Sequence, residues 1–218
     1  PYTTLFRSVK LSASGRRLPF VLESHIVSFV ASVPDLFALL TASKEMRALV
    51  HDILRTSTHL TLELPHEHDH ERAVDQVFAA VLALSTHLRT LEVERYVYGC
   101  DVPAASLSSI IAANAATLRK LAVRAEQTEV EVAAIAACSE LRSLEYWGKF
   151  GDAALAQQIT DACTKLERLC LPELLLTAEL SARLAPLLLE LTLKIPRIDF
   201  GGVAALSRLR ALRSLSLS

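Results

Sequence analysis

LRTLEV (residues 88–93), LRKLAV (118–123), LRSLEY (141–146), LERLCL (166–171), LLELTL (188–193) and LRSLSL (212–217) are six copies of one short pattern in this chain. Each copy has leucine at positions one and four and leucine, valine or tyrosine at position six. Their starts are separated by 30, 23, 25, 22 and 24 residues. Leu60 and Leu62 fit a partial seventh copy. A recurring period of this length predicts an array of stacked repeats over residues 58–218.

The segments between the copies have the spacing of helices. Apolar residues recur every three or four positions over residues 73–84, 106–116, 130–138 and 152–163. Each repeat is therefore predicted to be a short strand followed by a helix. One such unit cannot cover its own apolar face, so stacked neighbours would bury the leucines in a continuous core. The sequence predicts an α/β solenoid with short parallel strands.

The period and the leucine positions resemble those of leucine-rich repeats. Cys138 and Cys163 stand three residues before Leu141 and Leu166, which is similar to the cysteine-containing subtype of that family. A small buried thiol suits the corner between helix and strand. The family's Asn or Cys eight residues after the first leucine is missing. Those positions hold Tyr96, Glu126, Lys149, Leu174 and Pro196, so we expect an irregular solenoid.

Residues 18–49 form a second pattern, Leu18-Pro19-x-x-Leu22-x-x-x-Ile26-x-x-Phe29-Val30, a break at Pro34-Asp35, and Leu36-x-x-Leu39-x-x-x-Ser43-Lys44-x-Met46-Arg47-x-Leu49. The apolar spacing predicts two or three short amphipathic helices with Pro34 as a breaker. The pattern also resembles the F-box. Val21, Glu23 and Met46 depart from the usual Glu, Leu and Trp of that motif. An ordinary helical cap over the first repeat is the alternative interpretation.

The resemblance implies a role for the block at residues 18–57. It would dock a Skp-type adaptor and pack its own small core, and the solenoid would recruit a target as the substrate receptor of an SCF-type ubiquitin ligase. The alternative is a free-standing leucine-rich-repeat scaffold or inhibitor. The residues that the resemblance assigns to the adaptor are Leu18, Pro19, Leu22, Ile26, Leu36, Leu39 and Leu49.

Composition limits the classes of partner. The chain has 218 residues, of which 51% are hydrophobic, and its net charge is -1. This balance gives no general attraction to nucleic acid or to an anionic membrane. No apolar stretch reaches the roughly 18 to 20 residues of a membrane span. The four cysteines do not form a disulfide framework. We expect reduced thiols in a cytoplasmic or nuclear protein that binds neither membranes nor nucleic acid.

The ends of the chain have features of processing. Residues 1–8 resemble the translation of a sequencing adapter and are left out of the fold prediction, and residues 9–17 are predicted to be a linker. Met46 is the only methionine, and residue 218 falls inside a repeat. We expect the chain to be a fragment of a longer protein.

One segment resembles a metal site. His66-Glu67-His68-Asp69-His70 matches H-E-x-x-H, in which two histidines on a helix bind zinc. Pro65 directly before it and the missing downstream histidine favour a polar loop, with adventitious metal binding as a lesser alternative. The six glycines form no phosphate-binding loop, and no catalytic triad is apparent. The sequence predicts no enzyme activity, no cofactor and no metal.

Alternation along each strand predicts the binding face. Positions four and six point into the core, so positions three, five and seven should lie on the concave face. Trp147, flanked by Arg124 and Arg168, is the expected binding hot spot; alternatively its ring covers the corner of its own repeat. The arginines at position two, Arg89, Arg119, Arg142 and Arg213, are expected to form a solvated edge. The predicted concave-face residues are Glu92, Glu94, Lys120, Arg124, Glu145, Trp147 and Arg168.

Overall fold

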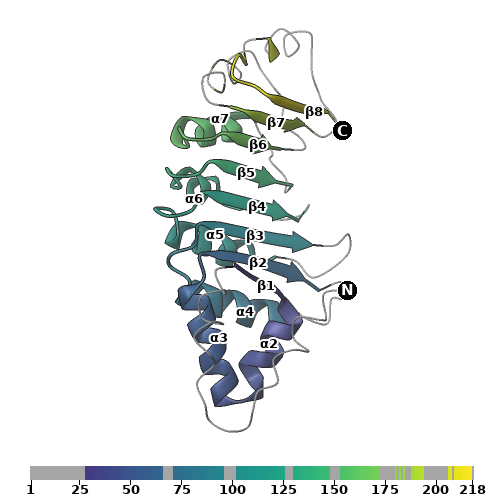
Figure 1. Cartoon of the computed structure of the whole chain (residues 1–218), viewed down its shortest axis with the longest axis vertical. Helices are drawn as coiled ribbons and strands as arrows, with labels where there is room; N and C mark the ends of the chain where they lie inside the picture. Colours follow the sequence, from purple (N-terminus) through teal and green to yellow (C-terminus); the bar gives the residue numbers. More distant parts are fainter. Residues whose placement is uncertain are drawn as a thin grey trace.

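The computed structural model of this protein describes residues 28–65, 71–95, 102–125, 130–147, 153–171, 188–193 and 209–217, together with residues 180, 182, 184, 206 and 207. The described strands form one parallel sheet in the order in which they occur along the chain. The helices of the repeats lie along one side of this sheet, and the two N-terminal helices lie at its lower end in Figure 1. The predicted α/β class and the stacking of strand and helix units are confirmed.

The sheet contains β1 (Ser28–Ser32), β2 (His59–Leu64), β3 (Thr90–Arg95), β4 (Lys120–Arg124), β5 (Ser143–Tyr146), β6 (Arg168–Cys170), β7 (Glu190–Leu193) and β8 (Ser214–Leu217). The helices are α2 (Val33–Ala42), α3 (Lys44–Thr56), α4 (Glu71–Leu84), α5 (Ala104–Ala113), α6 (Val132–Ala136) and α7 (Ala153–Ala162). The last four lie where the apolar spacing predicted helices. None of the helices in the described residues is long and apolar enough to cross a membrane.

The predicted register of the leucines is confirmed. The position-four residues pair side by side across the sheet: Leu60, Leu91, Leu121, Leu144, Leu169, Leu191 and Leu215. Position six follows the same order through Leu62, Val93, Val123 and Tyr146. Because side chains alternate along a strand, positions four and six of every copy point to the same face of the sheet.

A ladder of shared carbonyl groups joins each repeat to the next. The carbonyl oxygen of Arg119 accepts hydrogen bonds from the backbone N–H groups of both Arg142 (2.8 Å) and Ser143 (3.0 Å). The position-two carbonyl of every described repeat from β2 to β7 accepts two such bonds; these residues are Thr58, Arg89, Arg119, Arg142, Glu167 and Leu189. Position two therefore stays in register along the stack even though the repeats differ in length.

The leucines pack against the helices in one continuous core. Leu144 and Leu169 are only 1% and 2% exposed, as predicted. Leu215 was also expected in the core, but it is 42% exposed. It lies on β8, which pairs only with β7 among the described strands, so its side chain is covered from one direction alone.

The N-terminal block differs from the expected set of helices. Phe29 and Val30 lie in β1, which pairs in parallel with β2 opposite Leu60 and Thr61. Pro34 lies in the first turn of α2 and does not break a helix. Proline suits this position because the first N–H groups of a helix have no partner within the helix. Val33, Leu36 and Leu54 join the same core as the repeat leucines, so β1, α2 and α3 continue the stack.

Buried polar groups close the corners where helices end. Cys138 and Cys163 are buried, as expected, and their thiols donate to the carbonyl oxygens of Ala134 (3.4 Å) and Ile135 (3.6 Å). Burial raises the pKa of Cys138 to about 12 and that of Cys163 to about 11. Both are free thiols.

Asn114 takes the corresponding place after α5. Its amide nitrogen donates to the carbonyl oxygens of Ser85 (2.8 Å) and Ile110 (2.9 Å), and its amide oxygen accepts from the N–H of Leu88 (2.8 Å). The backbone carbonyl of Asn114 also accepts a hydrogen bond from the position-one leucine of the next copy, as do the carbonyls of Cys138 and Cys163. One buried amide thus ties two repeats together.

Candidate binding face of the sheet

The face of the sheet opposite the helices carries the polar residues. We call it the open face and define it by positions three, five and seven of β2 to β7. Most of its side chains are half-buried, whereas positions four and six beneath them are buried. Its described members are His59, Thr61, Glu63, Thr90, Glu92, Glu94, Lys120, Ala122, Arg124, Ser143, Glu145, Trp147, Arg168, Cys170, Glu190 and Thr192.

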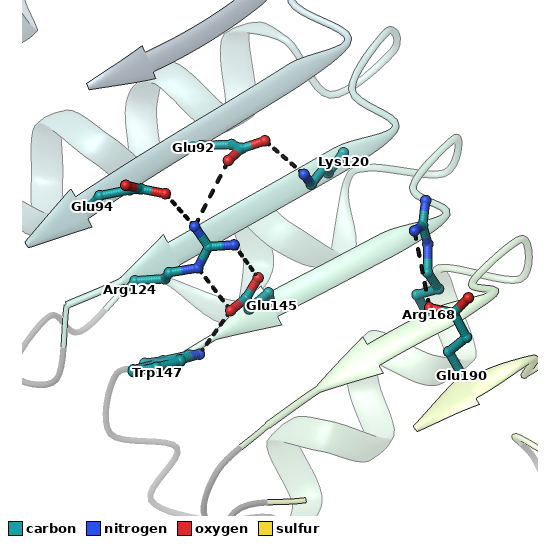
Figure 2. A network of polar contacts seen from close by, with 8 residues as sticks. All are labelled: Glu92, Glu94, Lys120, Arg124, Glu145, Trp147, Arg168 and Glu190. Atoms are coloured by element: carbon teal, nitrogen blue, oxygen red, sulfur yellow. Dashed lines mark hydrogen bonds and ion pairs between the residues drawn. The ribbon is translucent and has the colours of Figure 1, made fainter. Parts of the chain in front are cut away.

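Arg124 is the centre of an ion network that spans three strands (Figure 2). Its guanidinium forms a two-pronged contact with Glu145 on β5, with N···O distances of 2.8 and 2.7 Å. The same guanidinium pairs with Glu94 on β3 and lies 3.9 Å from Glu92. Lys120 donates to Glu92 at 2.6 Å. Forked contacts of this kind fix both distance and orientation, so these side chains are held in place before any partner arrives.

Ala122 provides the space for this network. It stands between Glu92 and Glu145 in the strand register. It is fully buried, yet it lies outside the leucine core. On the open face, burial of a methyl group requires cover from above, and the charged side chains around it supply that cover. A larger residue here would push the guanidinium of Arg124 away from its carboxylates.

The network perturbs the ionisation of its members. The hydrogen bond from Arg124 is the main reason why the pKa of Glu145 lies below its ordinary value, with a smaller contribution from Trp147. In turn, the hydrogen bond to Glu145 is the main reason why the pKa of Arg124 lies above its ordinary value. Each group therefore stays charged over a wider pH range because the other one is present.

Carboxylates outnumber cations in this part of the open face. Glu92, Glu94 and Glu145 face Lys120 and Arg124. Glu63 is the strand neighbour of Glu94, and two like charges placed side by side on a sheet destabilise it. This part of the open face therefore carries an excess of negative charge.

Trp147 extends the network at the end of β5. Its ring nitrogen donates to Glu145 at 3.0 Å, and its backbone N–H donates to the carbonyl oxygen of Val123 at 2.8 Å. The ring is half-buried. The structure thus confirms the expected neighbourhood of Trp147 and Arg124, because both contact Glu145.

Arg168 was expected to flank Trp147, but it does not. Register places Arg168 beside Ser143, at the start of β5, whereas Trp147 follows the end of that strand. Arg168 instead lies 4.0 Å from Glu190, and this pair is set apart from the network (Figure 2). Position three and position seven of a strand stand four residues apart, so Arg168 and Trp147 lie at opposite ends of their strands.

The residues assigned to an adaptor are only partly described. Leu36 is fully buried in the shared core, so it is a packing residue in this structure. Leu39 and Leu49, on α2 and α3, are half-buried. Leu18, Pro19, Leu22 and Ile26 lie outside the described residues, as do His66 and the rest of its motif. Within the described ranges, no group of three metal-ligating side chains could hold a metal ion.

Some contributors to the site could not be named from the sequence. Ala122 was placed on the open face, but its burial beneath the charged side chains depends on how those side chains fold over the strand. The contact between the ring of His59 and the hydroxyl of Thr90, 2.9 Å apart, likewise depends on side-chain conformation. Their adjacent register positions are the only sequence signal for it.

No family model matches this chain, and neither a curated protein nor a solved structure matches it. The function is therefore argued from the open face itself.

Proposed function

We propose that this chain is a leucine-rich-repeat protein whose open face binds another protein. The observation that carries the proposal is the ion network around Arg124 with Trp147 beside it. The leucine period and the parallel stack support the repeat assignment. The chain would supply a shaped surface, and no chemistry.

Preorganisation is the physical argument for this face. A side chain that becomes ordered only on binding lowers affinity through the loss of its freedom. Arg124, Lys120 and their carboxylates are already ordered by one another. Trp147 adds a broad rigid ring, and tryptophan and arginine are the residues that most often dominate binding energy.

The test is a paired measurement on Trp147→Ala. Once a partner has been isolated with the full chain, we expect this variant to lose at least about thirtyfold in affinity, the effect of a hot spot. Its melting temperature should stay near that of the parent, because the ring lies outside the leucine core. Arg55→Ala, on an exposed part of α3, is the control and should change neither quantity. A normal affinity for Trp147→Ala would contradict the proposal.

A narrower proposal concerns residues 18–57. We infer from their resemblance to the F-box that they hold a Skp-type adaptor, which would make the chain a substrate receptor of an SCF-type ubiquitin ligase. The segment from Asp35 to Leu49 follows the resemblance without a gap, apart from Met46 in place of Trp, and Ser43 within it caps α3. Leu39 and Leu49 are partly exposed on α2 and α3, so they are available for an adaptor.

The alternative is a free-standing scaffold or inhibitor whose helices act only as a cap. The pairing of β1 with β2 and the shared core support this alternative, because a cap must continue the stack that it protects. Both alternatives use the open face in the same way. They differ in whether α2 and α3 bind a second protein.

Direct binding of the purified full chain to a Skp-type adaptor separates the two proposals. An SCF receptor should form an equimolar complex that Leu39→Asp or Leu49→Asp abolishes. Ala48→Asp, at an exposed position of α3, is the matched control. Melting curves of all three variants establish whether the fold persists. Absence of binding by the parent chain would leave the scaffold as the remaining proposal.

A further inference from the structure

Basic side chains gather at the edge of the sheet where the strands begin. We call it the arginine edge and define it by the turns before β3, β4, β5, β6 and β8, residues 85–89, 114–119, 137–142, 163–167 and 209–213. The strands point away from this edge, which is the left-hand one in Figure 1. The shared carbonyl ladder holds position two of each repeat in register with the next one here.

The charge of this edge contrasts with that of the whole chain. It holds six cationic residues, Arg89, Arg119, Arg142, Lys165, Arg210 and Arg213, and two anionic ones, Glu140 and Glu167. The difference is a charge of +4, whereas the complete chain has 23 Lys and Arg, 24 Asp and Glu, and a net charge of -1. The remainder of the chain therefore carries -5, and the charge is strongly separated.

Both carboxylates of the edge already form ion pairs with basic residues of the edge. Glu140 pairs with Lys165, and Glu167 accepts from Arg142 at 2.7 Å. Arg89, Arg119, Arg210 and Arg213 are exposed, and none of them has an ion pair within the part of the chain that the structure describes. Like charges in a row repel one another, and exposed guanidinium groups add nothing to the leucine core. The pKa of Glu140 is lowered mainly by its hydrogen bond with Lys165, and Arg119 adds a smaller part. Among the described residues, Arg89, Arg210 and Arg213 have no such carboxylate.

We propose that the arginine edge binds an acidic segment of a partner protein. The distance from β3 to β8 is five strand spacings, or about 24 Å at 4.8 Å each. An extended peptide of about seven residues covers this length. Carboxylates are the natural ligands of guanidinium groups, which present their donors as a fork. This surface is separate from the open face, and the proposal does not depend on the function proposed for that face.

Nucleic acid fits this edge less well. Proteins that hold single strands stack the bases on aromatic side chains. The five turns of the edge contain no Phe, Tyr or Trp. Reading a duplex requires a helix or ribbon that enters a groove, and the edge consists of the turns between helices and strands. The observations therefore favour a polypeptide with carboxylate side chains.

The experiment uses the full chain and a fluorescent decapeptide of alternating Glu and Asp. We expect binding that weakens as salt is added, and about tenfold weaker binding by Arg89→Gln/Arg119→Gln, the effect of losing two exposed ion pairs of average strength. The matched control is Lys44→Gln/Arg72→Gln, which removes the same charge from exposed positions at the start of α3 and α4. Circular dichroism and melting curves check that both variants fold.

Three results would overturn the proposal. The first is failure of the parent chain to bind the acidic peptide at low salt. The second is an equal loss of affinity in the edge variant and the control variant, because binding would then follow net charge alone. The third is tighter binding of a ten-residue uridine oligonucleotide than of the peptide, which would assign the edge to nucleic acid. A Gln and Asn decapeptide should not bind.

Discussion

A leucine at one position of the repeat can be indispensable in one strand and dispensable in another. Leu144 and Leu169 lie between neighbouring strands and beneath helices, whereas Leu215 occupies the same register position on β8 and is 42% exposed. The amount of apolar surface removed from water, and not the identity of the residue, determines its contribution to stability.

We therefore expect Leu144→Ala and Leu169→Ala each to lower the free energy of unfolding by about 2 to 5 kcal/mol, since each leaves a cavity in a packed core. Leu215→Ala is the matched control and should cost less than about 1 kcal/mol. Denaturant titration of the three variants measures the differences. Equal losses at all three positions would show that the register of burial is wrong.

Asn114 illustrates the opposite case, a buried polar residue that stabilises because all of its groups are paired. Asn114→Ala would remove three hydrogen bonds and leave the Leu88 N–H and the Ser85 carbonyl without their partner. We expect a loss of about 3 kcal/mol, the cost of stranding buried polar groups. Ser109→Ala, which removes one exposed hydroxyl on α5, is the control. Near-parental stability of Asn114→Ala in the same titration would mean that water replaces the amide.

At the scale of elements, the Arg124 network joins β3, β4 and β5 through side chains as well as backbone. Glu145 has a lowered pKa because the folded state stabilises its charged form, mainly through Arg124. Its contribution to stability is therefore complete above its ordinary pKa of 4.5. That contribution is lost as the pH falls below this value and through the lower pKa of the folded state.

The expected result is a stability difference between the parent and Glu145→Gln that is present at neutral pH and shrinks below pH 4.5. Denaturant titrations at several pH values measure it. Asp75→Asn, which removes one carboxylate at an exposed position of α4, serves as the control. A difference that stays constant down to acid pH would mean that Glu145 is not held by charge.

The same scale shows what the sequence could predict. The leucine period fixes the register from β2 to β8, because one residue of slip would turn every side chain to the opposite face. β1 was missed because Leu22, Ile26, Phe29 and Val30 follow each other at helical spacing and lack the repeat pattern. Its pairing with β2 shows that tertiary contacts can override such local spacing.

Side-chain geometry was the second part that could not be predicted. Alternation along the strands placed Arg124, Glu145 and Trp147 on one face, and this was correct. It could not show that Arg124 would bridge two neighbouring strands, because that depends on the conformations of long flexible side chains. Asn114 was missed for a simpler reason: it stands four residues before its leucine, whereas Cys138 and Cys163 stand three before theirs.

At the scale of the molecule, one core links repeats that contact only their neighbours. Cys138 and Cys163 report on this core, because burial raises both thiol pKa values, to about 12 and about 11. Only the thiolate reacts with alkylating reagents. We expect both residues to be labelled far more slowly in buffer than in urea, and Cys138 more slowly than Cys163, because the pKa of Cys138 is the higher of the two.

Mass spectrometry of iodoacetamide-treated protein resolves the individual sites. Cys170, which is half-buried on the open face, should be labelled before Cys138 and Cys163 and serves as the comparison. Labelling of either buried thiol as fast in buffer as in urea would contradict the expectation, since it would mean that the core around that cysteine is open.

The ladder of shared carbonyls also determines how the molecule would respond to force. Tension applied to the two ends of the stack would act along the row of strands, so the bonds of each rung would be peeled open in turn instead of being sheared together. Each released repeat of 22 to 31 residues would add roughly 70 to 110 Å of extended chain. Such a molecule would lengthen in small steps at low force. The repeats at its ends would unfold one after another, while the repeats in contact with a bound partner stayed folded.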